Sequence, residues 1–209
     1  MSELVEPNPL LIEYFVKVRQ LLTDLNKDIS SFREANEWPY IESNIEFNIF
    51  LLERLKSLDL LPESPIKILD CGIGLATIMY DLYLQSKEIS DHEFEFYGVE
   101  KWRPYIDSFN EHLSGYWNGA LHITEDDLMN HNYSQYNFIW IFTPYSTSDK
   151  LMQFFDKVIS EMPVAGIVFG LDQYRIETYG SESLRMKLGL LKPYKVDELV
   201  LYRKTHGIL

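Results

Sequence analysis

The stretch KILDCGIGLAT, from Lys67 to Thr77, joins an apolar run to a glycine-rich turn, and it decides the fold. IKILD predicts a buried strand, and ATIMYDLYLQS predicts the helix that follows it. A glycine-rich turn between a strand and a helix usually cradles an anion with its backbone N–H groups. Asp70 stands at the mouth of this turn, where a carboxylate would repel a phosphate. Either the segment is only a turn, or its ligand presents a positive charge there.

Strands and helices alternate from this turn to the C-terminus. Helices are predicted over residues 103–113, 148–162 (with Ser148 as its cap) and 181–191. Strands separated by helices of this length favour an α/β fold, a doubly wound and mainly parallel sheet with helices on both faces. The last strand is expected to run antiparallel at or near the edge. Further strands are predicted in FEFYGVE (94–100), ALHIT (120–124), NFIWIF (137–142), GIVFGL (166–171) and DELVLYR (197–203).

Two helices are predicted before the first strand. Apolar residues follow one helical face between Asn8 and Lys27, with Asn8 as cap and Pro9 in the first turn. A second helix is predicted from Ser43 to Leu58, where Ser43 and Glu46 form a capping box. We therefore predict an N-terminal helical segment over residues 1–62, packed on a ligand-binding domain over residues 63–209. Covering the sheet is the simplest role for the first helix, and a lid or a dimer contact are the alternatives.

Composition limits the classes of partner. Of the 209 residues, 46% are hydrophobic, which predicts a globular protein, and no apolar run is long enough to span a membrane. The net charge of −13 disfavours nucleic acid as a partner, although basic residues gathered in the last fifth of the chain leave a local basic face as an alternative. The acidic N-terminus and the single cysteine favour the cytoplasm. The histidines show no metal-binding spacing, so no metal is expected.

Acidic residues follow three successive predicted strands. Asp70 ends the first, Glu100 the second, and Asp126 and Asp127 follow the third. In an open parallel sheet, ligands bind outside the carboxyl ends of the strands, where these acids would converge. The glycine pattern here is G-x-G-x-x-T, so it departs from the dinucleotide fingerprint, and no P-loop is present.

The segment ILDCGIGLAT resembles motif I of class I S-adenosylmethionine-dependent methyltransferases, whose pattern is D-x-G-x-G-x-G/A. The resemblance implies a Rossmann-like fold and S-adenosylmethionine as the cofactor, whose ammonium group resolves the conflict at Asp70. It implies that Glu100 holds the ribose hydroxyls and that Asp126, or else Asp127, meets the adenine amino group. Asn137 stands where the family commonly has Asp before its fourth strand. The implied cofactor-binding residues are Asp70, Cys71, Gly72, Gly74, Ala76, Glu100, Asp126, Asp127 and, from the upstream segment WPYIES, Tyr40 and Ser43.

The segment FTPYS after the fourth strand is similar in part to the Asn/Asp/Ser-Pro-Pro-Tyr motif of amino-methylating enzymes. The similarity implies Thr143, Pro144 and Tyr145 as catalytic residues, with Tyr145 as a platform for the acceptor. A proline-containing turn with an inward aromatic is the alternative. The predicted function is methyl transfer to a small-molecule or protein acceptor, with nitrogen as one candidate atom. The alternative is an inactive or regulatory domain that only binds S-adenosylmethionine.

Overall fold

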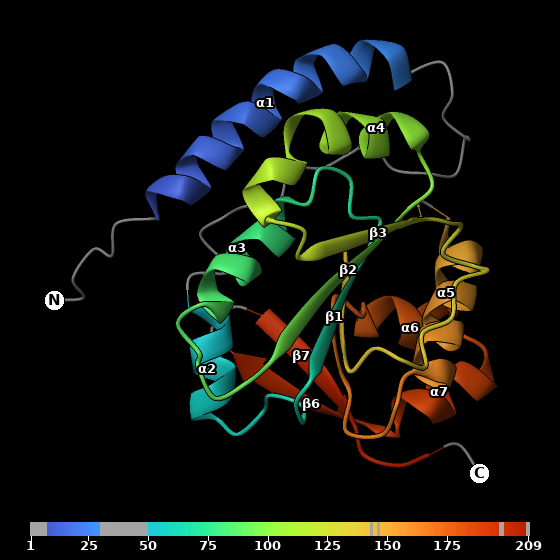
Figure 1. Cartoon of the computed structure of the whole chain (residues 1–209). Coiled ribbons are helices and arrows are strands. Elements are labelled where there is room, and N and C mark those ends of the chain that lie inside the picture. The colour runs from blue at the N-terminus through green and yellow to red at the C-terminus, as the bar shows by residue number, and fades with distance from the viewer. Residues whose placement is uncertain (1–7, 30–49, 143, 146, 197–198, 208–209) are drawn as a thin grey trace, which may run out of the picture.

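The computed structural model describes residues 8–29, 50–142, 144–145, 147–196 and 199–207 (Figure 1). Their centre is a seven-stranded sheet with the strand order β3-β2-β1-β4-β5-β7-β6, in which only the pairings of β7 with β5 and β6 are antiparallel. The predicted α/β class and the antiparallel last strand are therefore confirmed. The strands are β1 (Ile66–Cys71), β2 (Phe94–Glu100), β3 (Leu121–Glu125), β4 (Phe138–Ile141), β5 (Ile167–Phe169), β6 (Leu191–Val196) and β7 (Leu199–Lys204).

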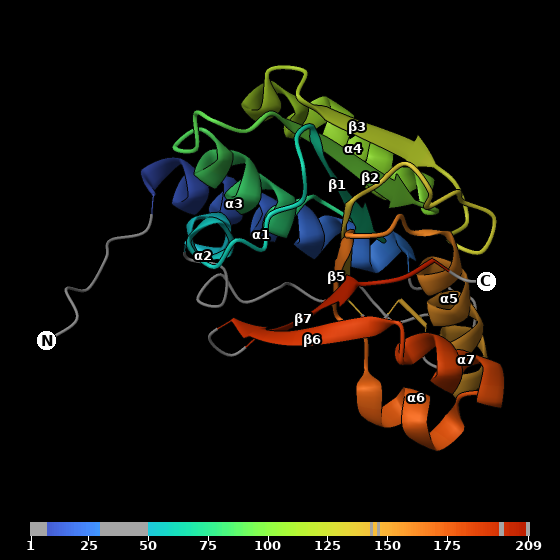
Figure 2. The same ribbon diagram turned by 90° about the horizontal axis from the view of Figure 1, so that it is seen from below.

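Helices cover both faces of the sheet. Figures 1 and 2 show α1 to α4 on one side and α5 to α7 on the other, and each group shares a separate core cluster with the sheet. Apolar residues alternate between these two clusters along each strand because successive side chains of a strand point to opposite faces. The helices are α1 (Pro9–Ile29), α2 (Leu51–Ser57), α3 (Thr77–Ser86), α4 (Arg103–His112), α5 (Ser148–Glu161), α6 (Gln173–Tyr179) and α7 (Glu182–Leu188), and a short 3-10 helix spans Ser114–Trp117.

The strand order reverses beside β1, which places the ligand-binding edge. β1 pairs in parallel with β2 on one side and with β4 on the other. The chain passes from β1 to β2 through α3, and from β3 across to β4 without an intervening α-helix. In sheets of this kind, the crevice at the carboxyl ends of the strands next to the reversal is where ligands bind. The glycine turn after β1 lies at this position.

Helix α1 packs with α2, α3 and α4 on one face of the sheet. Covering the sheet is the simplest of the roles considered for it. Leu11, Tyr14 and Val18 are buried in the same core cluster as the inward side chains of β1 and α3. The Tyr14 hydroxyl donates a 2.7 Å hydrogen bond to the carbonyl of Leu75, inside the glycine turn, and accepts one from the indole N–H of Trp117 at 3.3 Å. The first helix of the chain thus holds the turn that carries the predicted site.

Asn137 fastens the start of β4 to the segment that leads into β1. Its Oδ1 accepts a 2.7 Å hydrogen bond from the Lys67 N–H, and its Nδ2 donates to the carbonyls of Glu63 and Pro65 at 3.1 Å. The amide supplies both donor and acceptor, which the Asp common at this position in the resembled family cannot do while ionised. The departure from the family pattern is therefore accommodated by structural hydrogen bonds.

Four predictions of local structure need correction. The described part of the second helix begins at Leu51, since Phe50 before it has a left-handed backbone (φ 65°); residues 43–49 lie outside the described ranges. The cap of α5 is Thr147 rather than Ser148. The sequence reading missed α6, and it ran the helix from 181 through Leu191, where β6 begins. Strand β6 contains Pro193, which is tolerated there because β6 is the edge strand.

Candidate functional site

The glycine turn directs its backbone N–H groups at β2. Gly72, Gly74 and Ala76 have positive φ angles of 81°, 53° and 59°, which glycine adopts without strain at the first two positions. The N–H groups of Gly72 and Ile73 donate to the Val99 carbonyl at 2.9 and 3.0 Å. Since these donors are already bound within the protein, the turn differs from a phosphate-binding loop, whose amides face the ligand.

Glu100, at the end of β2, has a buried carboxylate that holds the turn. Its Oε2 accepts a hydrogen bond from the Gly74 N–H at 2.9 Å, and its Oε1 accepts one from the Trp102 N–H at 2.9 Å. The residue is 5% exposed. A carboxylate offers roughly four acceptor positions, so one such group can serve backbone amides and ligand hydroxyls together. The predicted ribose-binding acid is therefore in contact with the predicted glycine turn.

Asp70 is the second buried carboxylate of the site. It is 7% exposed, and its side chain lies on the α1–α4 face of the sheet, as do those of Ile66 and Ile68. Burial, and secondarily the negative charge of Glu100, raise the pKa of Asp70 to about 7. Two buried carboxylates at one site favour a ligand that carries positive charge. A cationic ligand would be attracted to Asp70 and would lower its pKa.

Asp126 is held beside the end of β2 by its own loop. Its N–H donates to the Glu100 carbonyl at 3.1 Å, and its Oδ1 accepts from the Asp127 N–H at 2.8 Å. Its Oδ2 lies 3.2 Å from Nδ1 of His131, whose Nε2 lies 3.2 Å from the Tyr136 hydroxyl. His131 lies in a loop but is buried. His131 therefore fixes the orientation of the acid that was preferred for adenine binding.

Asp127 links the third strand end to the segment after β4. Its Oδ1 accepts a 3.3 Å hydrogen bond from the Tyr145 hydroxyl, and its Oδ2 lies 3.6 Å from Nζ of Lys101. Partial burial alone would raise the pKa of Asp127, but the N–H of Met129 and the charges of Lys101 and Lys150 outweigh it, so the pKa is lowered. Asp127 is thus an ionised acid with protein partners.

The chain resembles known proteins in its fold rather than in its sequence. No protein-family model matches the chain, and no curated relative matches it by sequence. Among solved structures, a Methanococcus maripaludis protein assigned as an S-adenosyl-L-methionine-dependent methyltransferase aligns with a TM-score of 0.53 at 10% identity, over 82% of this chain and 99% of that one. A T. thermophilus 16S rRNA methyltransferase, solved with AdoMet and guanosine, aligns with a TM-score of 0.54 at 16% identity, over 81% of this chain and 45% of that one.

The chain has the fold of the class I methyltransferases. A Pyrococcus horikoshii protein assigned as an RNA methyltransferase agrees, with a TM-score of 0.50 at 16% identity over 76% of this chain and 82% of that one. Identities this low establish the architecture alone. They confirm the Rossmann-like fold that the motif I resemblance implied.

Most of the residues carried over from the class I methyltransferase pattern meet at one edge of the sheet. The glycine turn contacts Glu100, the backbone of Asp126 contacts that of Glu100, and Tyr145 contacts Asp127. Pro144 is half-buried next to Tyr145. Three other predicted residues, Tyr40, Ser43 and Thr143, lie outside the described residues, so their roles stay predictions.

The side chain of Cys71 lies on the opposite face of the sheet from that of Asp70. It is 2% exposed on the α5–α7 face, and burial, together with the charge of Asp70, raises the pKa of its thiol well above the usual value despite a hydrogen bond with Tyr133. A neutral, buried thiol is not a nucleophile. In the described ranges, no group of three or more His, Cys, Asp or Glu side chains could hold a metal ion, and no helix is both long and apolar enough to cross a membrane.

Tyr145 is buried in this conformation. It is 3% exposed, its ring packs edge-on against Phe154 with centroids 5.6 Å apart, and Nζ of Lys150 lies 4.6 Å from its centroid. Its hydroxyl is directed at Asp127. These contacts suit a residue that positions the acid loop, and they favour the alternative of an inward-packing aromatic. The platform role for an acceptor stays a prediction.

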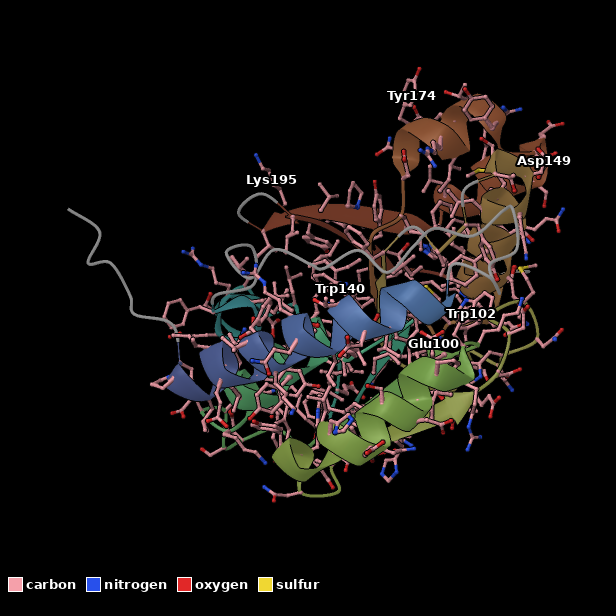
Figure 3. All side chains as sticks on the ribbon, turned by 90° about the horizontal axis from the view of Figure 1, so that it is seen from above. Glu100, Trp102, Trp140, Asp149, Tyr174 and Lys195 are labelled. Carbon is pink, nitrogen blue, oxygen red and sulfur yellow. The ribbon has the colours of Figure 1, made fainter. Side chains whose placement is uncertain are left out.

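Sequence reasoning missed two aromatic residues next to this edge. Tyr14 of α1 bonds the glycine turn from a distance of 61 residues along the chain, and no local motif marks it. Trp140 of β4 is the register partner of Asp70. Figure 3 labels Trp140 in the middle of the molecule, as it does Glu100 and Trp102, whereas Tyr174 and Lys195 extend outward at its periphery. Its only sequence signal is its place one residue before the end of an apolar strand.

Proposed function

We propose that this protein binds S-adenosylmethionine across the carboxyl ends of β1, β2 and β3 and transfers its methyl group to an acceptor. The observation that carries the proposal is the buried pair of carboxylates, Asp70 and Glu100, on either side of a glycine turn whose first two amides are already bound. A phosphate-bearing dinucleotide suits neither Asp70 nor the turn. A nucleoside that carries an ammonium group suits both.

Three acidic residues would each bind a different group of S-adenosylmethionine. Asp70 would neutralise the ammonium group, directly or through water, and Glu100 would accept the two ribose hydroxyls in charge-assisted hydrogen bonds. Asp126, oriented by His131, would accept from the adenine amino group. When bound, the sulfonium supplies an activated methyl donor, and the contribution of the chain is orientation and exclusion of water.

The acceptor is proposed only as a class, a small molecule or a protein side chain, with nitrogen as a candidate atom through the Thr143-Pro144-Tyr145 segment. The surplus of acids over bases, 32 against 19, argues against a large nucleic acid. The buried ring of Tyr145 specifically favours the second candidate, a domain that binds S-adenosylmethionine without turnover. Transfer of a labelled methyl group to metabolite and protein pools distinguishes the two: incorporation supports the enzyme, and its absence from every pool supports the binding domain.

Calorimetric titration tests cofactor binding itself. Wild-type protein is expected to bind S-adenosylmethionine and to give no heat with NAD⁺. Glu100→Gln removes the charge that accepts from ribose hydroxyls, so the affinity is expected to fall at least about tenfold. Glu125→Gln is the matched control, because Glu125 is the register partner of Glu100 on β3 but is exposed and paired with Arg103.

The control variant is expected to bind like wild type. Absence of heat with S-adenosylmethionine, or an equal affinity of the Glu100→Gln variant, would refute the proposed binding mode. Tighter binding of NAD⁺ than of S-adenosylmethionine would reverse the assignment of the ligand.

A further inference from the structure

Three side chains form a row on the α1–α4 face at the carboxyl ends of the central strands. Asp70 of β1 is the register partner of Trp140 of β4, and Trp140 is the register partner of Phe169 of β5. Register partners in parallel strands lie on the same face, about 4.8 Å apart at the backbone. The rings of Trp140 and Phe169 pack with centroids 5.1 Å apart at 31°. The indole therefore lies beside the carboxylate proposed to meet an ammonium group.

Trp140 has a buried donor without a partner. The residue is 6% exposed, and its indole N–H makes no hydrogen bond within the part of the chain that the structure describes. An indole N–H can only donate. Buried polar groups in native proteins are nearly always hydrogen-bonded, so each exception requires an explanation. Trp117 shows the usual arrangement, because its buried N–H donates to the Tyr14 hydroxyl.

An anionic or carbonyl oxygen of a ligand would satisfy this donor. The row then places the Asp70 carboxylate, which can neutralise a positive charge, directly next to the indole N–H donor of Trp140. An amino-acid group is complementary to this pair, since it carries an ammonium and a carboxylate on the same carbon atom. S-adenosylmethionine ends in such a group. The rings of Trp140 and Phe169 are packed together, which fixes the orientation of the indole.

We propose that Trp140 donates its indole N–H to the carboxylate of bound S-adenosylmethionine, beside the ammonium group that Asp70 neutralises. This inference rests on the proposed function and goes further, because it makes Trp140 a residue that selects ligands with a complete amino-acid end. Trp140 has a positioning role. It holds the carboxylate of the ligand at β4, so that the sulfonium of the ligand lies near the point where the strand order reverses. No bond is made or broken at Trp140.

The test compares three adenosyl ligands by calorimetry. S-adenosylmethionine has both charged groups, decarboxylated S-adenosylmethionine has the ammonium but no carboxylate, and 5′-deoxy-5′-methylthioadenosine has neither. Each is titrated into wild type and into Trp140→Phe, which keeps an aromatic ring and deletes the donor. A hydrogen bond to a charged group corresponds to an affinity change of about tenfold or more.

Wild type is expected to prefer S-adenosylmethionine over its decarboxylated form by about tenfold or more. In Trp140→Phe this preference is expected to disappear, while the affinities for the two ligands without a carboxylate stay within about twofold of wild type. Retention of the preference in the variant, or equal weakening of all three ligands, would overturn the proposal. In the last case the indole would only pack against the ligand.

Thermal unfolding without ligand shows whether the variant is folded. Trp140→Phe is expected to lower the midpoint only through the loss of buried ring volume, because its N–H has no hydrogen bond to lose. Trp117→Phe is the matched control and is expected to lower the midpoint further, because it deletes the same ring volume and also breaks the bond to Tyr14. If wild type binds none of the three adenosyl ligands, the proposed function itself fails. If wild type binds all three equally well, only the role of Trp140 is refuted.

Discussion

The Tyr14 hydroxyl joins the N-terminal helix α1 to the glycine turn by a hydrogen bond. Tyr14→Phe removes this hydroxyl and keeps the ring. The substitution abolishes two hydrogen bonds, to the Leu75 carbonyl at 2.7 Å and from the Trp117 indole at 3.3 Å. Tyr14 and Leu75 are 0% exposed and Trp117 is 1% exposed, so water cannot replace the lost partner. A buried polar group left without a partner costs about 1–3 kcal/mol.

For these two groups we expect a loss of about 3 kcal/mol in the free energy of unfolding. In a chain of this length, that loss lowers the thermal midpoint by roughly 6–12 °C. The assay is urea and thermal unfolding followed by both circular dichroism and fluorescence, since agreement of the two probes justifies a two-state free energy.

Tyr116→Phe is the matched control for this prediction. Tyr116 packs edge-on against Tyr14 in the same aromatic cluster, but its hydroxyl bonds Glu13 at the surface, where water can substitute. We expect a loss of no more than about 0.5 kcal/mol. Equal losses for the two variants, or a Tyr14→Phe protein as stable as wild type, would show that α1 does not hold the turn through this hydroxyl.

Three further predictions follow from single contacts. Gly98→Ala places a Cβ 2.3 Å from Cδ1 and 2.9 Å from Cβ of Ile73 in the glycine turn, so we expect a loss of about 1–3 kcal/mol in thermal unfolding and weaker S-adenosylmethionine binding by calorimetry. Burial raises the pKa of Asp70 to about 7, whereas the unfolded chain releases this proton near pH 4. The free energy of unfolding of the wild type therefore falls as the pH rises between these two values. Urea titrations should show that Asp70→Asn is more stable than wild type at pH 8 and that the difference is smaller at pH 5. The buried Lys204 ammonium donates to three carbonyls at the end of α5, so Lys204→Met should lower the free energy of unfolding by about 2–4 kcal/mol in urea, and an unchanged midpoint would contradict this role.

Missed elements show where sequence patterns lose their information. Strand β6 escaped prediction because Pro193 normally argues against a strand, and only pairing with β7 at the edge of the sheet makes this segment one. The helix expected over residues 43–58 does not run unbroken through Phe50, whose backbone is left-handed before α2, whereas the capping box at Ser43 and Glu46 lies outside the described residues. A tertiary contact at Pro193 and the backbone conformation at Phe50 outweighed the local preference.

The sequence by itself determined the order of strands and helices from β1 to β5, the class of sheet and the positions of Asp70, Glu100 and the glycine turn. These are local properties, because side-chain periodicity and the need for positive φ are written into neighbouring residues. The tertiary structure decided which groups meet: Tyr14 with Leu75, His131 with Asp126, and Trp140 next to Asp70. Such pairings depend on strand order and on which polar groups remain unsatisfied once the core is closed, and neither is encoded in a short stretch of chain.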